Sequence, residues 1–169
     1  EEEKLAHDVY VTLYAQWGLP IFQNIANSEA AHTGAIQALL DRYGVADPAT
    51  GKAVGEFTNP DLKKLYDQLI AQGSRSQTDA LKVGAVIEDI DILDLQTRSA
   101  QTTNADINQV YSNLMKGSEK GLVVVMGDSE NSKLAQVLLE GKMPKKGPKL
   151  TPDQVQIIVN WIDAGAQNN

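Results

Sequence analysis

Apolar side chains recur every three or four residues over most of the first 118 residues, and glycine or proline interrupts the pattern at intervals. This spacing places apolar residues on one face of a helix. It predicts four long helices and one short helix, at 3–17, 21–43, 59–73, 76–96 and 104–116. Residues 45–58 are rich in turn formers and predict a connecting loop. Helices with one apolar face bury it against each other, so we expect a mainly α four-helix bundle whose short helix braces a crossover.

The pattern changes near residues 117–121. A β-branched run at 121–125 predicts a short strand. Two further helices are predicted at 132–140 and 151–164, and the second begins with Thr151, Pro152 and Gln154 in positions typical of a helix start. We therefore expect two domains, a helical bundle over 1–118 and a small helical tail over 119–169.

Composition limits the classes of partner. The chain is 42% hydrophobic and 22% charged, an ordinary balance for a folded globular protein. Its net charge of -7 disfavours binding to nucleic acid or to an anionic membrane surface. The lysines at 142, 145, 146 and 149 form a short cluster without aromatic residues, which favours a solvated loop. No apolar run approaches the roughly 20 residues that cross a bilayer, so no transmembrane segment is expected.

The absence of cysteine excludes whole classes of chemistry. Without Cys the chain has no disulfides, thiolate metal sites or iron-sulfur clusters, and covalently attached haem is not expected. With only two histidines, no Ser-His-Asp arrangement is evident. The sequence starts at Glu1 inside a helical pattern and without Met, so we expect that an upstream segment has been removed or left out, and a signal peptide is one candidate.

Acidic residues and one histidine recur at positions bracketed by apolar residues. Glu29 and His32 are three residues apart and share one face of a helix, and Glu88 and Asp91 do the same on a later helix. The first helix offers Glu2 and Glu3. Carboxylates with an imidazole suit iron, manganese or zinc, and buried carboxylates must be paired or metal-bound. Each pair alone is more typical of polar residues on a helix surface. The hypothesis of a metal site depends on finding both pairs and the first-helix glutamates together.

The same residues resemble a known family. The stretch 21–32 (IFQNIANSEAAH) resembles the second helix of rubrerythrin-type ferritin-like proteins, in which Glu-x-x-His supplies two metal ligands. The stretch 3–10 (EKLAHDVY) resembles their first helix, where a Glu precedes a Tyr by seven residues, and this register selects Glu3 over Glu2. Residues 1–118 as a whole are similar to a prokaryotic ferritin-like family known only as a domain of unknown function. The resemblance implies a metal centre at Glu3, Glu29, His32, Glu88 and Asp91.

The last helix of the bundle departs from the rubrerythrin pattern. A second Glu-x-x-His would fall on Ser118 and Gly121, and neither residue is a good ligand. Glu119 is a substitute out of phase with the motif. We therefore expect one or two ions of iron, with manganese or zinc as alternatives, in an incomplete site.

The tail has its own resemblance. The segments 127–134, 141–144, 150–152 and 161–166 resemble the C-terminal half of a small cytochrome c domain, in which the Met of a Met-Pro pair is an axial haem ligand. Met143 carries that motif, but no Cys-x-x-Cys-His is present to attach haem. Met143 would therefore be a cofactor ligand only if haem were bound, and a haemless remnant is favoured. Residues omitted near 118–121 would explain both missing motifs.

Other candidate residues have simpler interpretations. His7 lies one turn after Glu3, but the family register gives that position to solvent-facing residues. Tyr10, Tyr14 and Tyr111 are candidate electron relays, although core packing is the better interpretation for all three.

Two functions stay open on the sequence. The first is a redox protein with a carboxylate-bridged di-iron or manganese centre, acting as an oxidase, peroxidase or ferroxidase. The second is a non-catalytic metal-binding or structural module with an incomplete site. By analogy with the two families we expect a homo-oligomer, an electron-transfer partner or larger assembly, and an extracytoplasmic location, periplasmic or secreted.

Overall fold

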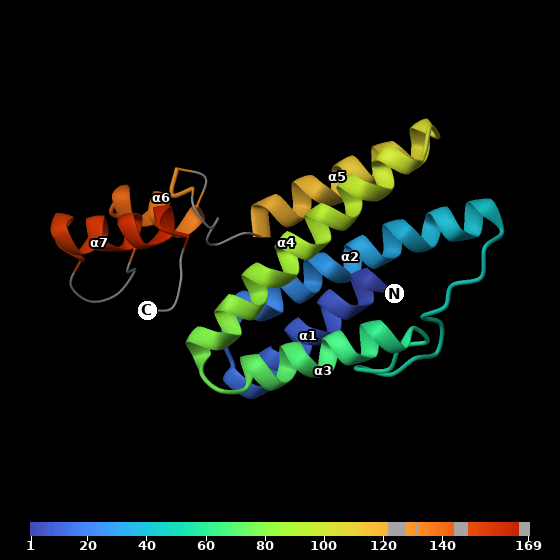
Figure 1. The fold of residues 1–169 in the computed structure, drawn as a ribbon, viewed down its shortest axis with the longest axis horizontal. Helices are drawn as coiled ribbons and strands as arrows, with labels where there is room; N and C mark the ends of the chain where they lie inside the picture. The colour runs from blue at the N-terminus through green and yellow to red at the C-terminus, as the bar shows by residue number, and fades with distance from the viewer. Residues whose placement is uncertain (122–127, 131, 144–148, 166–169) are drawn as a thin grey trace. The chain divides into compact units, whose positions relative to one another are not determined.

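The computed structural model describes residues 1–121, 128–130, 132–143 and 149–165 (Figure 1). Regular secondary structure within these residues is entirely α-helical, which confirms the mainly α prediction. The chain divides into two compact units, Glu1–Glu119 and Lys120–Asn169. The helices of the described residues are α1 (Glu2–Trp17), α2 (Pro20–Tyr43), α3 (Pro60–Gly73), α4 (Gln77–Gln101), α5 (Ala105–Gly121), α6 (Lys133–Leu139) and α7 (Pro152–Asp163).

Local signals set most of the helix ends where the sequence predicted them. Gly18 and Gly44 follow α1 and α2 with φ of 64° each, in the left-handed region that glycine adopts without strain. The side chain of Asn59 accepts a hydrogen bond from the Asp61 backbone and starts α3. Ser76 caps α4 in the same way, by accepting from Asp79.

Two helix ends differ from the prediction. The helix α4 continues to Gln101, beyond the predicted end at 96, because residues 97–101 contain neither Gly nor Pro to stop it. The helix α5 reaches Gly121, beyond the predicted end at 116, because Gly117 lies inside the helix. Gly121 is therefore helical, and residues 122–125 of the predicted strand lie outside the described residues.

The core of the first unit is built around α1, which packs against α2, α3 and α4. Val9, Tyr10 and Leu13 of α1 are completely buried. The indole nitrogen of Trp17 donates a hydrogen bond to the Gly73 carbonyl at 2.9 Å and so ties the end of α1 to the end of α3. Packing on three sides makes α1 the central helix of this unit.

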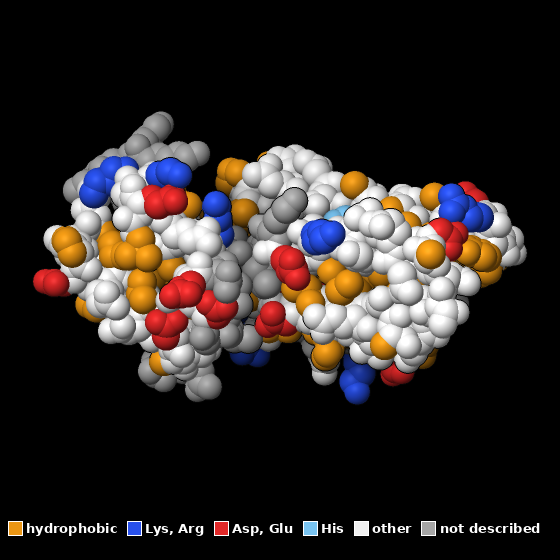
Figure 2. Space-filling view, turned by 90° about the horizontal axis from the view of Figure 1, so that it is seen from above, with side chains coloured by type: hydrophobic (Ala, Val, Ile, Leu, Met, Phe, Trp, Pro, Cys, Tyr) orange, Lys and Arg blue, Asp and Glu red, His pale blue; other side chains and the backbone are white. Residues whose placement is uncertain are grey.

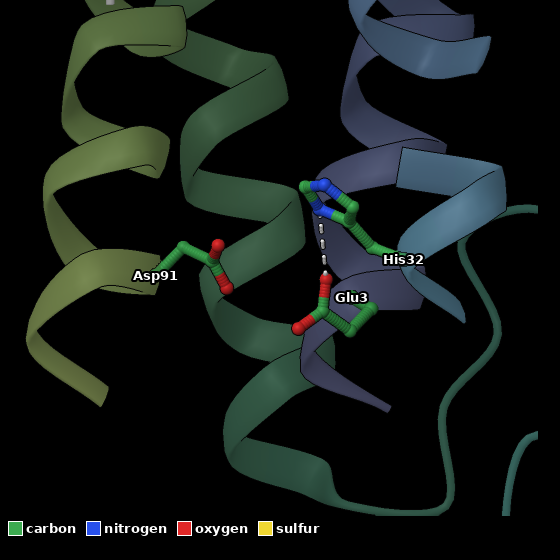
Figure 3. Close-up of side chains that lie close together, drawn as sticks. All are labelled: Glu3, His32 and Asp91. Carbon is green, nitrogen blue, oxygen red and sulfur yellow. Dashed lines mark ion pairs between the residues drawn. The ribbon is translucent and has the colours of Figure 1, made fainter. Parts of the chain in front are cut away.

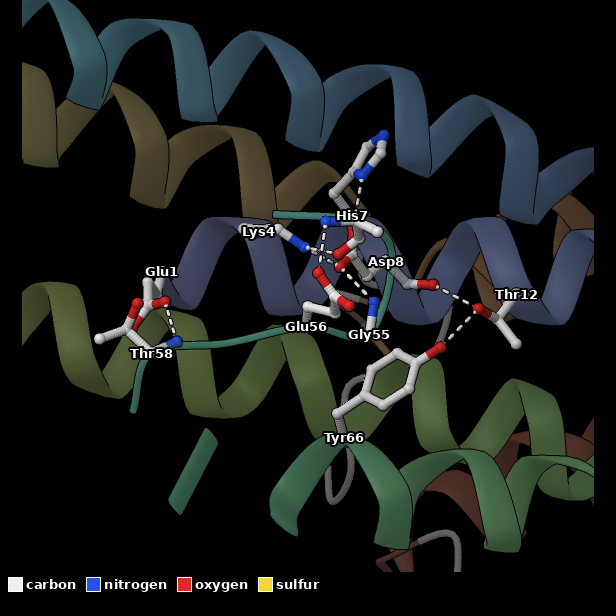
Figure 4. A network of polar contacts seen from close by, with 10 residues as sticks. Glu1, Lys4, His7, Asp8, Thr12, Gly55, Glu56, Thr58 and Tyr66 are labelled. Atoms are coloured by element: carbon white, nitrogen blue, oxygen red, sulfur yellow. Dashed lines mark hydrogen bonds and ion pairs between the residues drawn. The ribbon is translucent and has the colours of Figure 1, made fainter. Parts of the chain in front are cut away.

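A polar network joins α1 to the loop between α2 and α3 (Figure 4). Asp8 is only 2% exposed, and its carboxylate accepts hydrogen bonds from Lys4, from the Gly55 backbone at 2.9 Å and from His7 at 3.1 Å. Burial alone would raise the pKa of Asp8, but these hydrogen bonds outweigh burial and lower it. The network fastens the predicted crossover loop to the core, and His7 belongs to it.

The second unit contains α6 and α7, which pack against each other. Ala135 of α6 and Ile162 of α7 are completely buried. The predicted helix start at Thr151 is confirmed, because Thr151 and Gln154 exchange side chain to backbone hydrogen bonds. Met143 follows α6 and is 38% exposed.

Within the described part of the chain, no helix combines the length and apolar character that crossing a bilayer requires. On the face drawn in Figure 2, basic side chains stand singly or in small groups among acidic and uncharged ones.

Candidate metal centre

Three helices of the first unit bring the five predicted ligand residues into its interior. Glu3 comes from the first turn of α1, Glu29 and His32 from α2, and Glu88 and Asp91 from α4. All five are buried, with exposures between 2% and 8%. Figure 3 shows Glu3, His32 and Asp91 converging from these helices. The spacing of each pair on one helix face explains why both of its members point inward.

Glu3, His32 and Asp91 form the tightest group. One potential ligand atom from each lies within 4.8 Å of the others. Atoms bound to a single first-row cation lie roughly 3 to 4 Å apart. Small side-chain rotations would therefore bring all three onto one ion.

Glu29 and Glu88 are the other two predicted ligand residues, and each has its own contact. Nδ1 of His32 lies 3.1 Å from Oε2 of Glu29 and 3.5 Å from Oε2 of Glu3. Tyr10 donates its phenolic hydrogen to Oε1 of Glu88 at 2.7 Å, and its oxygen also lies 3.0 Å from the Gly84 carbonyl. Nδ1 of His32 therefore faces two carboxylates, while Tyr10 holds Glu88 from the side of α1.

Four buried carboxyl groups around one imidazole perturb each other's protonation. The hydrogen bond with Glu29, followed by the ion pair with Glu3, raises the pKa of His32 to about 10. Burial, together with the charges of Glu29 and Asp91, raises the pKa of Glu88 to about 8. Burial and the charge of Glu3 raise the pKa of Asp91 to about 7. Without cations, protons reduce the repulsion in this cluster.

One atom of the cluster lacks a compensating donor. Oε2 of Glu3 is buried and has no hydrogen-bond partner among the described residues. Its 3.5 Å contact with His32 is an ion pair that is too long for a hydrogen bond. A buried oxygen without a donor costs about 1–3 kcal/mol or more if charged, so it is a natural position for a cation.

The helix α5 closes the cluster. Oγ of Ser118 donates a hydrogen bond to Oδ2 of Asp91 at 2.6 Å. A Cβ atom at Gly117 would lie 2.4 Å from Nε2 of His32, so the bare backbone of α5 leaves the space that the imidazole ring fills. Glu119 is exposed. The helix therefore positions two of the predicted ligand residues through Gly117 and Ser118.

Sequence reasoning identified Ser118 only as a missing ligand. Its role as a donor to Asp91 depends on the approach of α5 to α4, and the two residues are 27 positions apart in the chain. Tyr10 was interpreted as core, and it is completely buried, but its hydroxyl also reaches Glu88 across 78 residues. A buried Tyr usually needs a hydrogen-bond partner for its hydroxyl, and this requirement alone could have indicated that Tyr10 contacts a polar group.

A protein-family model described as "Uncharacterized protein domain (DUF2202)" matches residues 1–135. The chain belongs to this family. The matched range of the DUF2202 family contains the complete first unit and all five residues of the candidate metal centre.

Two comparisons concern one archaeal protein. The chain is 53% identical over 118 residues to "Uncharacterized protein MJ0754" of Methanocaldococcus jannaschii, a match that covers 70% of this chain and 64% of that protein. The chain thus spans less than two thirds of that relative's length in this match. The crystal structure of hypothetical protein MJ0754 from Methanococcus jannaschii has a TM-score of 0.73 and 41% identity, over 95% of this chain and 86% of that one. Identity is lower over the longer match.

Proposed function

We propose that the first unit is a ferritin-like four-helix bundle that binds iron or manganese between α1, α2 and α4 and works as a redox protein of the oxidase, peroxidase or ferroxidase type. Glu3, His32 and Asp91 would hold one ion, and Glu29 and Glu88 would help to hold a second. A bound iron or manganese ion would supply one-electron redox chemistry, which none of these side chains provides.

The observation that carries the proposal is the buried, donorless Oε2 of Glu3 beside three further buried carboxyl groups. Burying such a group of charges is very unfavourable unless they are compensated. Two divalent cations would balance four carboxylates around a neutral imidazole, and one cation would balance two of them. Carboxylate oxygens with one imidazole nitrogen form a suitable donor set for either metal.

The surrounding residues hold this donor set in place. Tyr10 donates to Glu88 at 2.7 Å and Ser118 donates to Asp91 at 2.6 Å, so each fixes the orientation of one carboxylate. The low exposure of all five proposed ligand residues keeps bulk water away from them. These contacts support a centre that is arranged before an ion enters.

A second candidate function is a non-catalytic metal-binding or structural module. It is favoured by Ser118 and Gly121 of α5, which stand at the positions where the rubrerythrin pattern has a further carboxylate and imidazole. A site with ligand residues from only three helices would suit binding better than turnover. The predicted homo-oligomer, electron-transfer partner and extracytoplasmic location stay predictions under both functions.

Metal binding is tested by comparing Glu3→Gln with the neighbouring Glu2→Gln. Glu2 is an exposed residue of the same helix turn, so its substitution removes one charge without reaching the centre. We expect calorimetric titration with Mn²⁺ or Fe²⁺ under anaerobic conditions to show binding to the wild type and to Glu2→Gln. Glu3→Gln should bind at least about tenfold more weakly, the change that corresponds to one lost ligand contact. Equal affinities in both variants, or no binding to the wild type, would reject the proposal.

The two candidate functions are separated by turnover. Oxidation of ferrous iron or consumption of peroxide by the metal-loaded wild type, lost in Glu29→Ala, supports the redox protein. Metal bound at the expected residues without either activity supports the module.

A further inference from the structure

A small pocket in the first unit lies beside the candidate metal centre. Its volume is about 100 Å³. Six aliphatic side chains from α1, α3 and α4 form its walls: Leu5, Ala6, Leu62, Leu65, Ile87 and Ile90. Asp91 also lines the pocket, and Asp91 belongs to the tight group with Glu3 and His32. One carboxylate is therefore shared between the pocket and the centre.

The charges around the pocket limit what it can hold. Glu2 and Asp94 are the other acidic residues of its lining, and Arg98 hydrogen-bonds to both, at 2.7 Å and 2.5 Å. Three carboxylates against one guanidinium disfavour an anion. The guanidinium occupies the two carboxylates that would otherwise attract a cation. Aliphatic walls cannot replace the hydration shell of an ion of either sign.

The volume limits the size of the ligand. A protein cavity of about 150 Å³ holds benzene, which has six heavy atoms, so about 100 Å³ accommodates a molecule of roughly two to four heavy atoms. The mostly aliphatic walls offer dispersion contacts to xenon and other small apolar molecules. A ligand of this pocket should therefore be small, neutral and largely apolar.

We propose that this pocket binds a small neutral molecule, of up to about four heavy atoms, and delivers it to the Asp91 side of the metal centre. The delivery step rests on the proposed function, because it requires a metal centre that reacts with a neutral molecule. That molecule would reach the centre from the side of α1, α3 and α4. The binding itself needs only the pocket and does not depend on a metal.

Matched variants exist on one helix. Ile90 is 41% exposed and lines the pocket, so Ile90→Phe should fill its outer part without disturbing the core. Leu93 is 65% exposed and is not among the lining residues, so Leu93→Phe adds the same ring to the same helix outside the pocket. Leu62→Phe, which adds a ring to the pocket lining from α3, is the alternative if Ile90→Phe perturbs α4.

The first measurement uses xenon on the metal-free protein. Methyl resonances of Leu5, Leu65 and Ile87 are followed by NMR as xenon pressure rises. We expect saturable shifts in the wild type and in Leu93→Phe, and an apparent affinity at least about tenfold lower in Ile90→Phe or Leu62→Phe. Absence of saturable shifts in the wild type, or equal shifts in all variants, would overturn the proposed pocket.

The second measurement uses nitric oxide, a neutral diatomic probe, on protein loaded with ferrous iron. We expect Ile90→Phe to slow the appearance of the iron-nitrosyl electron paramagnetic resonance signal at least about tenfold at unchanged iron content, and Leu93→Phe to leave the rate unchanged. An unchanged rate in Ile90→Phe would overturn the delivery step. If the wild type takes up no iron, the proposed function fails, and the xenon measurement still decides whether the pocket binds its ligand.

Discussion

Two buried polar clusters of the first unit both include residues of α1, but they shift the pKa values of their carboxylates in opposite directions. Asp8 accepts from Lys4, His7 and the Gly55 backbone, and its pKa is lowered. In the candidate metal centre carboxylates outnumber donors, and the pKa values of Glu88 and Asp91 are raised. Burial opposes ionisation in both places, so the supply of donors makes the difference. A cluster with sufficient donors stabilises the fold, whereas a cluster short of donors requires protons or cations.

The pH dependence of the metal-free protein should show the largest effect. The folded chain holds protons on Glu88 and Asp91 up to pH values of about 8 and 7, whereas the unfolded chain loses them near 4.5 and 3.8. Groups with raised folded-state pKa values stabilise fully below the unfolded value, and this contribution is lost as pH rises through the folded value. His32 acts in the same direction between 6.5 and about 10.

We therefore expect the free energy of unfolding to fall by several kcal/mol between about pH 5 and pH 9. Urea unfolding in the presence of a chelator measures it. Glu88→Gln should flatten the profile, because the neutral amide removes one titrating group. A profile that rises over this range would contradict the contrast drawn between the two clusters.

Removing the carboxylate of the satisfied cluster should come next in size. Asp8→Ala leaves the partly buried Lys4 without its carboxylate partner and leaves the Gly55 backbone donor unpaired. We expect a loss of about 3–5 kcal/mol of unfolding free energy, as for other broken buried ion pairs. Asp67→Ala is the control, because Asp67 pairs with Lys63 at the same helix spacing while both are exposed. Asp67→Ala should lower the free energy of unfolding by less than about 1 kcal/mol. Equal losses would mean that the Asp8 cluster is not a fold determinant.

The smallest expected effect concerns the hydroxyl of Ser118, one of the few donors of the candidate metal centre. Ser118→Ala removes its hydrogen bond to Asp91 and should lower the unfolding free energy by about 1 kcal/mol in metal-free protein near pH 8. Ser118→Thr, which keeps the hydroxyl, should restore most of the loss. The spectrum of bound Co²⁺ gives a second readout, because a misplaced Asp91 changes the ligand field. An unchanged spectrum in Ser118→Ala would limit the role of Ser118 to packing.

The contrast also explains which parts of the molecule were predictable. Glu29 and His32 lie on the same turn, and their inward orientation follows from helical spacing and from apolar neighbours. The donors to Asp8 include a backbone group 47 residues away, and no local pattern encodes that contact. Helix starts with Asn, Ser, Thr or Pro were predicted well. The ends of α4 and α5 were not predicted correctly. The helix α4 lacks a stop residue after 96, and Gly117 of α5 packs against His32 instead of ending its helix.

The place of Gly117 against His32 also bears on how this family can vary. A side chain at 117 would occupy the space of the imidazole ring, since even a Cβ would lie 2.4 Å from Nε2. As long as position 32 carries His, a larger residue at 117 requires the imidazole ring to shift, whereas a relative that loses the histidine is free to place a larger residue there. The two positions should therefore change together across the DUF2202 family. Covariation of the two positions would show whether this packing of residue 117 against residue 32 is shared by the family.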